Sequence, residues 1–131
     1  MEIWEIGHSS RSQEEFLRLV KKHKIEQVID VRRFPSSKKF PHFHKSHLQQ
    51  TMAENHMDYI WMGEKLGGFR KGGYEEWMKT EDFAAGVEEL EKKASHRRTA
   101  VMCAEGYFRR CHRRFILEYL EKKGWEVQHI H

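Results

Sequence analysis

The chain has 131 residues, of which 24 are Lys or Arg and 20 are Asp or Glu, so its formal charge is +4 with His neutral. This length fits one compact domain with a hydrophobic core and is too short for two ordinary domains. Hydrophobic residues make up 38% and charged residues 34% of the chain, which excludes a disordered polymer and a membrane-spanning protein. The first residues, MEIWEIGH, lack the basic and apolar regions of a signal peptide, so we expect a cytoplasmic protein. The positive charge permits an acidic partner and is equally typical of an ordinary solubility charge.

Strands and helices alternate along the predicted chain. In chain order the sequence predicts a strand over 2–6, a helix from 12 to about 24, a strand over 27–31, a helix over 47–55, a strand over 57–62, helices over 74–79 and 82–93, a strand over 99–103, a helix over 111–123 and a strand over 126–130. The capping-box spacing of Ser12 with Glu15 begins the first helix, and that of Ser46 with Gln49 begins the second. Thr80 begins the fourth helix.

One segment departs from this alternation. Residues 63–73 contain five of the nine glycines, so we expect a loop that is mobile or folded around a ligand.

The alternation predicts right-handed crossovers and parallel pairing. We therefore expect an α/β fold, a Rossmann-like three-layer α/β/α sandwich with a mostly parallel sheet of about five strands, in a single domain over 1–131. The strand order does not follow from the pattern, and the fold alone names no function.

Polar or reactive residues follow each of the first four predicted strands. The exits are GHSSR at 7–11, DVRR at 30–33, GEK at 63–65 and CAE at 103–105. In an open parallel sheet the ligand lies outside the carboxyl ends of the strands. The convergence of these four exits therefore predicts a site at that edge.

Two of these exits carry candidates for proton transfer and anion binding. His8 is a candidate general acid or base, or else a surface histidine beside a turn. Ser9 and the helix start after it offer backbone N–H groups to an anion, although helix capping alone also explains the serines. Asp30 lies beside Arg32 and Arg33, which are suited to bidentate phosphate binding; alternatively, Asp30 pairs with one arginine and orders the loop.

The loop from 38 to 45 interleaves cations with aromatic rings, a mixture that binds a nucleic-acid backbone and stacks bases. It is equally typical of a cationic loop with an aromatic anchor. The candidate nucleic-acid contacts are Lys38, Lys39, Phe40 and Lys45.

Two cysteines cannot build a disulfide framework, so in a reducing cytoplasm we expect free, reactive or metal-bound thiols. Cys103 and Arg109 have the C-x5-R spacing of cysteine phosphatases, although the loop between them holds only one glycine. A zinc site of Cys103, Cys111 and His112, with or without His8, is a second hypothesis, but adjacent helical residues diverge by about 100°. Third, Cys111 opens a helix whose dipole stabilises a thiolate. An inert buried cysteine is the alternative at both positions.

Five motifs resemble the DUF488 family in order and spacing. They are Gly7-His8-Ser9 with Arg11, Asp30-Val31-Arg32 leading to Pro35 and Ser37, Leu66-Gly67-Gly68, Cys103-Ala104-Glu105, and Cys111-His112-Arg113. The resemblance covers essentially the whole chain. It implies a small cytosolic α/β domain of bacteria and archaea with these motifs as its site, and it supplies no reaction. An arginine at Arg109 is not part of the family pattern, which counts against a phosphatase.

The leading hypothesis is an enzyme that acts on a phosphate-bearing substrate, a nucleotide or nucleic acid, at the carboxyl edge. The candidate catalytic residues are His8, Asp30, Glu105, Cys103 and Cys111. The candidate anion-binding residues are Ser9, Arg11, Arg32, Arg33, His112 and Arg113. The glycine-rich segment is a candidate lid.

The main alternative is a non-catalytic nucleic-acid-binding module, and a metal-dependent hydrolase is a third possibility. We expect no cofactor other than the zinc of that hypothesis, and no membrane partner. The sequence does not set the oligomeric state.

Overall fold

The computed structural model describes residues 1–106 and 111–131. Within them one sheet of five parallel strands has the order β3-β2-β4-β1-β5. The strands are β1 (Glu2–Gly7), β2 (Gln27–Asp30), β3 (Asp58–Trp61), β4 (Thr99–Cys103) and β5 (Glu126–His129). Each strand end lies within one residue of its predicted position.

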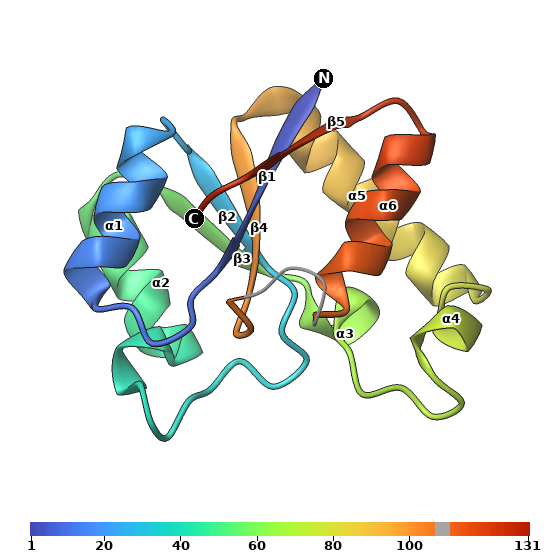
Figure 1. Ribbon diagram of the computed structural model, residues 1–131, viewed down its shortest axis with the longest axis horizontal. Helices are drawn as coiled ribbons and strands as arrows, with labels where there is room; N and C mark the ends of the chain where they lie inside the picture. Colours follow the sequence, from blue (N-terminus) through green and yellow to red (C-terminus); the bar gives the residue numbers. More distant parts are fainter. Residues whose placement is uncertain (107–110) are drawn as a thin grey trace.

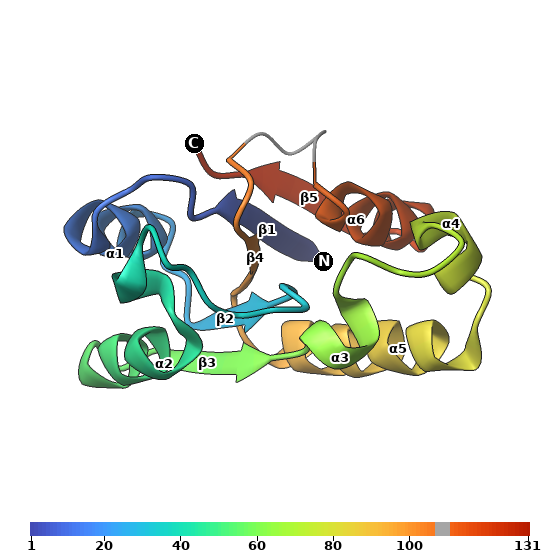
Figure 2. The same cartoon turned by 90° about the horizontal axis from the view of Figure 1, so that it is seen from below.

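Helices cover both faces of this sheet (Figure 1). They are α1 (Gln13–Lys22), α2 (Lys45–Glu54), α3 (Gly63–Leu66), α4 (Tyr74–Trp77), α5 (Glu81–His96) and α6 (Arg113–Lys122), with a 3-10 turn at Pro41–Phe43. Helices α1 and α2 lie on one side, and α5 and α6 lie on the other, which Figure 2 shows from below. The predicted Rossmann-like three-layer α/β/α sandwich is confirmed. In residues 1–106 and 111–131, no helix combines the length and the apolar character that crossing a membrane requires.

The sheet separates two hydrophobic cores. Because strand side chains alternate between faces, Ile3 of β1 joins the core against α5 and α6, whereas Trp4 and Ile6 join the core against α1 and α2. The first core includes Leu90 of α5, and the second includes Phe16 of α1.

The helix starts show how far the capping rules hold. The Ser12 hydroxyl accepts from the Glu15 N–H at 3.1 Å, as predicted. The second helix instead begins with His44 as its cap, because the His44 Nδ1 accepts from the Ser46 N–H at 3.3 Å. The prediction of Ser46 as the cap was wrong because an imidazole nitrogen takes the role that the capping preference assigns to short oxygen-bearing side chains.

The glycine-rich segment is more ordered than a simple loop. It contains the short helix α3, and the Arg70 side chain donates to the carbonyls of Gly67 at 2.8 Å and Gly63 at 3.3 Å. One side chain thus binds the two ends of this turn together, so the segment folds around its own arginine. Whether it also closes as a lid stays a prediction.

The order of the strands marks the end of β4 as the expected place of a ligand site. Strands β1 and β2 flank β4 and lead into helices α1 and α2 on one face, while β4 leads into α6 on the other. Chain segments that leave neighbouring strands toward opposite faces separate from each other at the carboxyl edge, which is where open α/β sheets bind ligands.

A buried ion pair joins α6 to the sheet. Arg113, the first residue of α6, is fully buried, and its Nε donates to Oε1 of the buried Glu5 on β1 at 2.8 Å. Its Nη1 donates to the Glu105 carbonyl and to Cys103 Sγ, both at 2.7 Å. Burial lowers the pKa of Arg113 while the Glu5 charge opposes the change. Oε2 of Glu5 lies 2.6 Å from Nδ1 of His129 on β5, so Arg113 and Glu5 together link β1, β4 and β5.

Removing one partner of this pair leaves an uncompensated buried charge. The variant Glu5→Ala is expected to lose about 3–5 kcal/mol of unfolding free energy. Urea denaturation monitored by far-UV circular dichroism measures the loss.

The matched control is Glu2→Ala, an exposed carboxylate on the same strand, which is expected to change stability by less than about 0.5 kcal/mol. Replacing both partners, Glu5→Leu with Arg113→Met, is expected to cost less than Glu5→Leu alone. Equal losses for Glu5→Ala and Glu2→Ala would show that the pair does not hold the fold.

Candidate functional site

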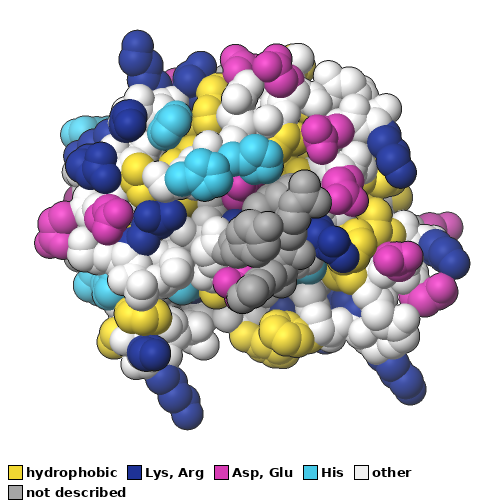
Figure 3. Space-filling view, in the orientation of Figure 1, with side chains coloured by type: hydrophobic (Ala, Val, Ile, Leu, Met, Phe, Trp, Pro, Cys, Tyr) yellow, Lys and Arg dark blue, Asp and Glu magenta, His cyan; other side chains and the backbone are white. Residues whose placement is uncertain are grey.

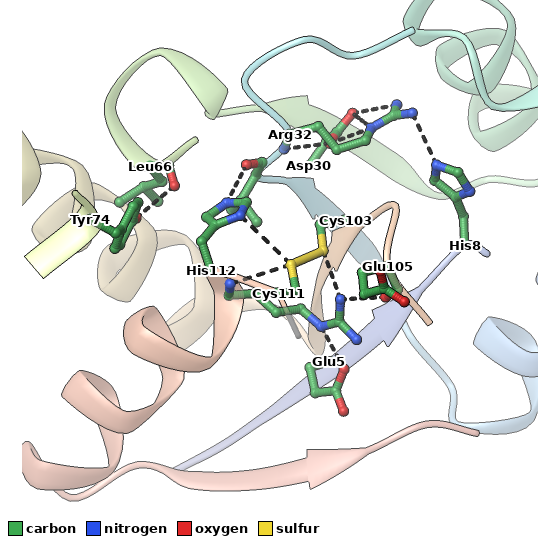
Figure 4. The surroundings of a disulfide bond; sticks show 12 residues. Glu5, His8, Asp30, Arg32, Leu66, Tyr74, Cys103, Glu105, Cys111 and His112 are labelled. Atoms are coloured by element: carbon green, nitrogen blue, oxygen red, sulfur yellow. Dashed lines mark hydrogen bonds and ion pairs between the residues drawn. A yellow bond between two sulfur atoms is a disulfide. The ribbon is translucent and has the colours of Figure 1, made fainter. Parts of the chain in front are cut away.

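Three strand ends bring separate motifs to one place (Figure 4). His8 follows β1, Asp30 ends β2 and Cys103 ends β4. The His8 N–H donates to the Cys103 carbonyl at 2.9 Å, and the Val31 N–H donates to the Met102 carbonyl at 2.9 Å. Because parallel pairing continues past the strand ends, the three exits form one rigid floor.

Asp30 is fully buried, and its carboxylate holds Arg32. Arg32 donates from Nε to Oδ1 at 2.9 Å and from Nη2 to Oδ2 at 2.7 Å, and its backbone N–H donates to Oδ1 at 3.0 Å. The Tyr59 hydroxyl donates to Oδ2 as well. Burial alone would lower the pKa of Arg32, but the hydrogen bonds and charge of Asp30 raise it. Asp30 therefore orients an arginine, which is the structural alternative that the sequence left open.

His8 lies on the other side of the same arginine. Its Nδ1 is 2.9 Å from the Ser9 carbonyl and so carries the hydrogen, while its Nε2 lies 3.4 Å from Arg32 Nη1 and accepts from it. The ring stacks on Phe43 with centroids 4.4 Å apart. Burial, aided by the charge of Arg32, lowers the pKa of His8 from 6.5 to about 4. His8 is neutral at pH 7, and its accepting nitrogen positions Arg32.

Cys103 and Cys111 form a disulfide that joins the end of β4 to the segment just before α6. The expectation of free or metal-bound thiols is therefore not met. The cysteine count could not show the pairing, because the pairing depends on how the chain returns from β4 to α6. The Arg113 N–H donates to Cys111 Sγ at 3.4 Å, so the start of α6 is directed at this sulfur.

His112 contacts the same sulfur. Its Nδ1 lies 3.6 Å from Cys111 Sγ, and its Nε2 donates to the Val31 carbonyl at 2.9 Å. Because the carbonyl can only accept, Nε2 carries the hydrogen and Nδ1 presents a lone pair to the sulfur. Burial lowers the pKa of His112, so its ring is neutral at pH 7. Helix α6 begins only at Arg113, so the predicted divergence of adjacent helical residues does not apply here.

Two glycines of the sequence motifs make room for these residues. A Cβ on Gly7 would overlap the backbone of Glu105, and a Cβ on Gly68 would lie 3.1 Å from His112 Nδ1. Both positions thus allow a close approach of the chain to a site residue.

A cavity of about 370 Å³ opens over this floor. Two arginines, Arg32 and Arg33, line it together with Cys103, Cys111 and His112. The exposed Glu105 belongs to the same wall. The volume of the cavity lies within the range of about 300–1,000 Å³ typical of small-molecule sites.

Three predicted anion-binding residues have other partners. The Ser9 N–H donates to the Ala104 carbonyl at 2.9 Å, so this amide pairs with the neighbouring strand exit. Arg11 donates from Nε to the Gly7 carbonyl at 3.2 Å and lies 3.5 Å from Glu15. Arg113 is buried against Glu5. Of the six predicted anion-binding residues, Arg32, Arg33 and His112 line the cavity. The other three, named above, make structural contacts instead.

The predicted nucleic-acid loop lies beside the site. Lys39 and Phe40 line a second cavity of about 380 Å³, which also contacts Glu105. Lys38 is exposed, and Lys45 Nζ lies 4.6 Å from the centre of the Trp61 ring. On the face drawn in Figure 3, Lys and Arg side chains are spread over the surface and mixed with acidic ones rather than gathered in one patch. Nucleic-acid binding by this loop stays a prediction.

Sequence reasoning missed Glu5, which holds Arg113, and Tyr59, which donates to the carboxylate that holds Arg32. A carboxylate in the middle of an otherwise apolar strand was the available signal for Glu5, because a central strand tolerates a buried charge only when it is paired. Nothing in the sequence pattern marked Tyr59, since its partner Asp30 is on the neighbouring strand. Burial and the adjacent Asp30 raise the pKa of Tyr59, so it donates as a neutral phenol.

The described residues add no support to the hypotheses of a metal site and of a cysteine phosphatase. In the part of the chain that the structure describes, no three His, Cys, Asp or Glu side chains gather as a metal site. The C-x5-R hypothesis depends on Arg109, which lies outside the described residues.

The fold and the polar crevice define a Rossmann-like α/β protein with its candidate site at the carboxyl ends of a parallel sheet. The chain belongs to the DUF488 family, described as a domain of unknown function, whose family model matches residues 12–120. The resemblance that the sequence motifs indicated is confirmed. No curated protein and no solved structure matches the chain.

The buried, neutral His8 makes stability depend on pH. The unfolded chain takes up a proton near pH 6.5 and the native His8 only near pH 4, so its contribution to stability is complete above pH 6.5 and is lost as the pH falls toward 4. Between pH 7 and 4.5 the loss is on the order of 2–3 kcal/mol. In His8→Asn the unfolding free energy, measured by urea titration, is expected to fall by that much less than in the wild type between pH 7 and 4.5.

The exposed His56 supplies the control. It has a positive φ of 59°, which Asn tolerates well, so His56→Asn makes the same substitution without removing a buried ring. A wild-type slope in His8→Asn would contradict the neutral assignment.

The disulfide predicts the count of reactive thiols, because Cys103 and Cys111 are the only cysteines of the chain. Without reductant the native protein is expected to take up no iodoacetamide, and after treatment with dithiothreitol it takes up two groups. Intact mass spectrometry counts them. Cys111→Ser is expected to take up one group without reductant, and two groups on the untreated wild type would show that the bond is absent.

Proposed function

We propose that the protein is an enzyme that binds a phosphate-bearing substrate in the 370 Å³ cavity and attacks it with a thiol of the reduced Cys103–Cys111 pair. One observation carries the proposal: two arginines and two cysteines line the same cavity. An anion bound by the arginines would lie beside the sulfur atoms.

Arg32 is preorganised for this role. A guanidinium has five N–H groups, and the contacts with Asp30 and His8 account for three of them among the described residues. Tyr59 also interacts with this side chain, and we propose that N–H groups left on Nη1 and Nη2 donate to oxygens of the phosphate. Since Asp30 and His8 already fix the side chain, substrate binding costs little of its conformational entropy.

The thiols must first be released. Two molecules of a thiol reductant reduce the disulfide to Cys103 and Cys111 thiols and leave as the oxidised disulfide, which balances two electrons and two protons. The Cys111 S–H then faces the lone pair of His112 Nδ1, at the 3.6 Å separation seen here. The Arg113 guanidinium, 2.7 Å from Cys103 Sγ, favours a thiolate at that position.

We assign Cys111 as nucleophile and His112 as base. The Cys111 proton passes to His112 Nδ1, the thiolate forms a bond to an electrophilic atom of the substrate while the bond from that atom to the leaving group breaks, and the leaving group takes the proton from His112. Water then attacks the cysteine-bound group, with Glu105 accepting its proton, and the thiolate departs. The Val31 carbonyl holds the His112 ring in the required tautomer, as the third member of a nucleophile, base and orienter set.

The second candidate function is the non-catalytic nucleic-acid-binding module. Lys39 and Phe40 beside the site favour it. It requires an affinity that falls steeply with salt and that persists when both cysteines are replaced by serine.

Phosphate binding is tested by protection of the thiols. Inorganic phosphate is expected to slow iodoacetamide alkylation of the reduced protein at least threefold, compared with chloride at equal ionic strength, because the bound anion covers the sulfur atoms. Arg33→Ala is expected to lose most of this protection, since its half-exposed side chain lines the cavity without being part of the core. Quenched-flow alkylation with mass detection measures the rates.

The matched control is Arg18→Ala, an exposed arginine on α1 that removes the same charge away from the cavity. It is expected to keep full protection. If phosphate protects neither the wild type nor Arg18→Ala, or if the two arginine variants behave alike, the proposed anion site is wrong.

A further inference from the structure

Two phenylalanines stand exposed at the mouth of the cavity. The Phe34 side chain is 63% exposed and that of Phe69 is 83% exposed, and both line the cavity. They come from different segments, after β2 and after α3, yet their ring centroids lie 5.9 Å apart. These two exposed rings, tilted by 35° to each other, form an apolar face on the cavity that Arg32 and Arg33 also line.

The structure holds this pair in place with hydrogen-bonding and charge contacts. Arg33 Nη1 donates to the Phe69 carbonyl at 2.6 Å, and the Arg33 guanidinium lies 5.6 Å from the centre of the Phe34 ring. Phe69 has a φ of 59°, a left-handed conformation that a bulky residue rarely adopts. Strain of this kind persists only where surrounding contacts impose it, and it is common at ligand sites.

We propose that the face formed by Phe34 and Phe69 binds a nucleobase, so that the substrate class is a nucleoside phosphate, either free or at the end of a strand. This inference rests on the proposed function, because it takes Arg32 and Arg33 as the site of the phosphate. A nucleoside phosphate joins a planar π-system to an anion, which matches a ring face above a guanidinium floor.

Stacking accounts for the exposure of the rings. Every base has a π-face, and stacking on an aromatic side chain strengthens binding about 5- to 100-fold by alanine substitution. The two rings already touch, so a base would stack on the outer face of the pair, where Phe69 is more exposed than Phe34.

The test compares three ligands on the disulfide-bonded protein by isothermal titration calorimetry. Adenosine 5′-monophosphate is expected to bind at least tenfold more tightly than ribose 5-phosphate, which lacks the base. Hexyl phosphate, which has apolar area without a π-face, is expected to bind no more tightly than ribose 5-phosphate. Equal affinity for all three would overturn the inference while leaving the phosphate site intact.

Variants at one ring provide the matched comparison. Phe69→Leu is expected to lose about tenfold in affinity for adenosine 5′-monophosphate and to keep its affinity for ribose 5-phosphate, whereas Phe69→Tyr retains both. Because the side chain is exposed, neither change disturbs the core. If Phe69→Leu binds adenosine 5′-monophosphate like the wild type, the ring does not stack a base.

A 5′-phosphorylated single-stranded oligonucleotide distinguishes the sources. Tighter binding of the oligonucleotide identifies a strand end as the ligand, and tighter binding of the mononucleotide identifies a free nucleotide. Either outcome supports the inference only if Phe69→Leu also weakens the binding. If phosphate protects the thiols but no nucleoside phosphate binds, the inference alone fails. If phosphate does not protect the thiols and no nucleoside phosphate binds, both the inference and the proposed function fail.

Discussion

The burial of the Arg113 guanidinium between α6 and the sheet is the constraint on which the site depends. A charge in the core requires a partner, and Glu5 of β1 supplies it. Because Arg113 is the first residue of α6, the ion pair also sets where that helix begins. Cys111 and His112, immediately before it, are thereby placed beside Cys103 at the end of β4. The helix start, the sulfur pair and the imidazole thus follow from one electrostatic requirement.

A second guanidinium repeats this arrangement on the other side of the cysteines. Arg32 is held by Asp30 of β2 as Arg113 is held by Glu5 of β1. In both cases the carboxylate comes from a strand, while Arg32 lies in the segment after β2 and Arg113 is the first residue of α6. Asp30 and His8, which the sequence marked as candidate acid and base, therefore position Arg32, and the chemistry that we propose falls to the sulfur atoms, His112 and Glu105.

The sequence predicted local structure well because strands and helix starts depend on neighbouring residues. The predicted strand over 99–103 coincides with β4, all of whose residues are buried, and Ser12 caps its helix as expected. The strand order and the sulfur pairing depend on contacts between distant segments, which no local period contains. His8 illustrates the limit for the site: its position at a strand end was predictable, but its neutral state depends on burial under Phe43 and on a neighbouring guanidinium.

The cavity combines two kinds of wall. Its floor belongs to strand exits that continue the hydrogen bonding of the sheet, so a substitution there disturbs the fold as well as the proposed site. Its rim consists of side chains such as Phe69 that contribute little to the core. The rim can therefore change during evolution while the floor stays the same. Under the proposed function, a substitution at the rim would change the group recognised beside the arginines without altering the floor, so one scaffold could serve several ligand preferences.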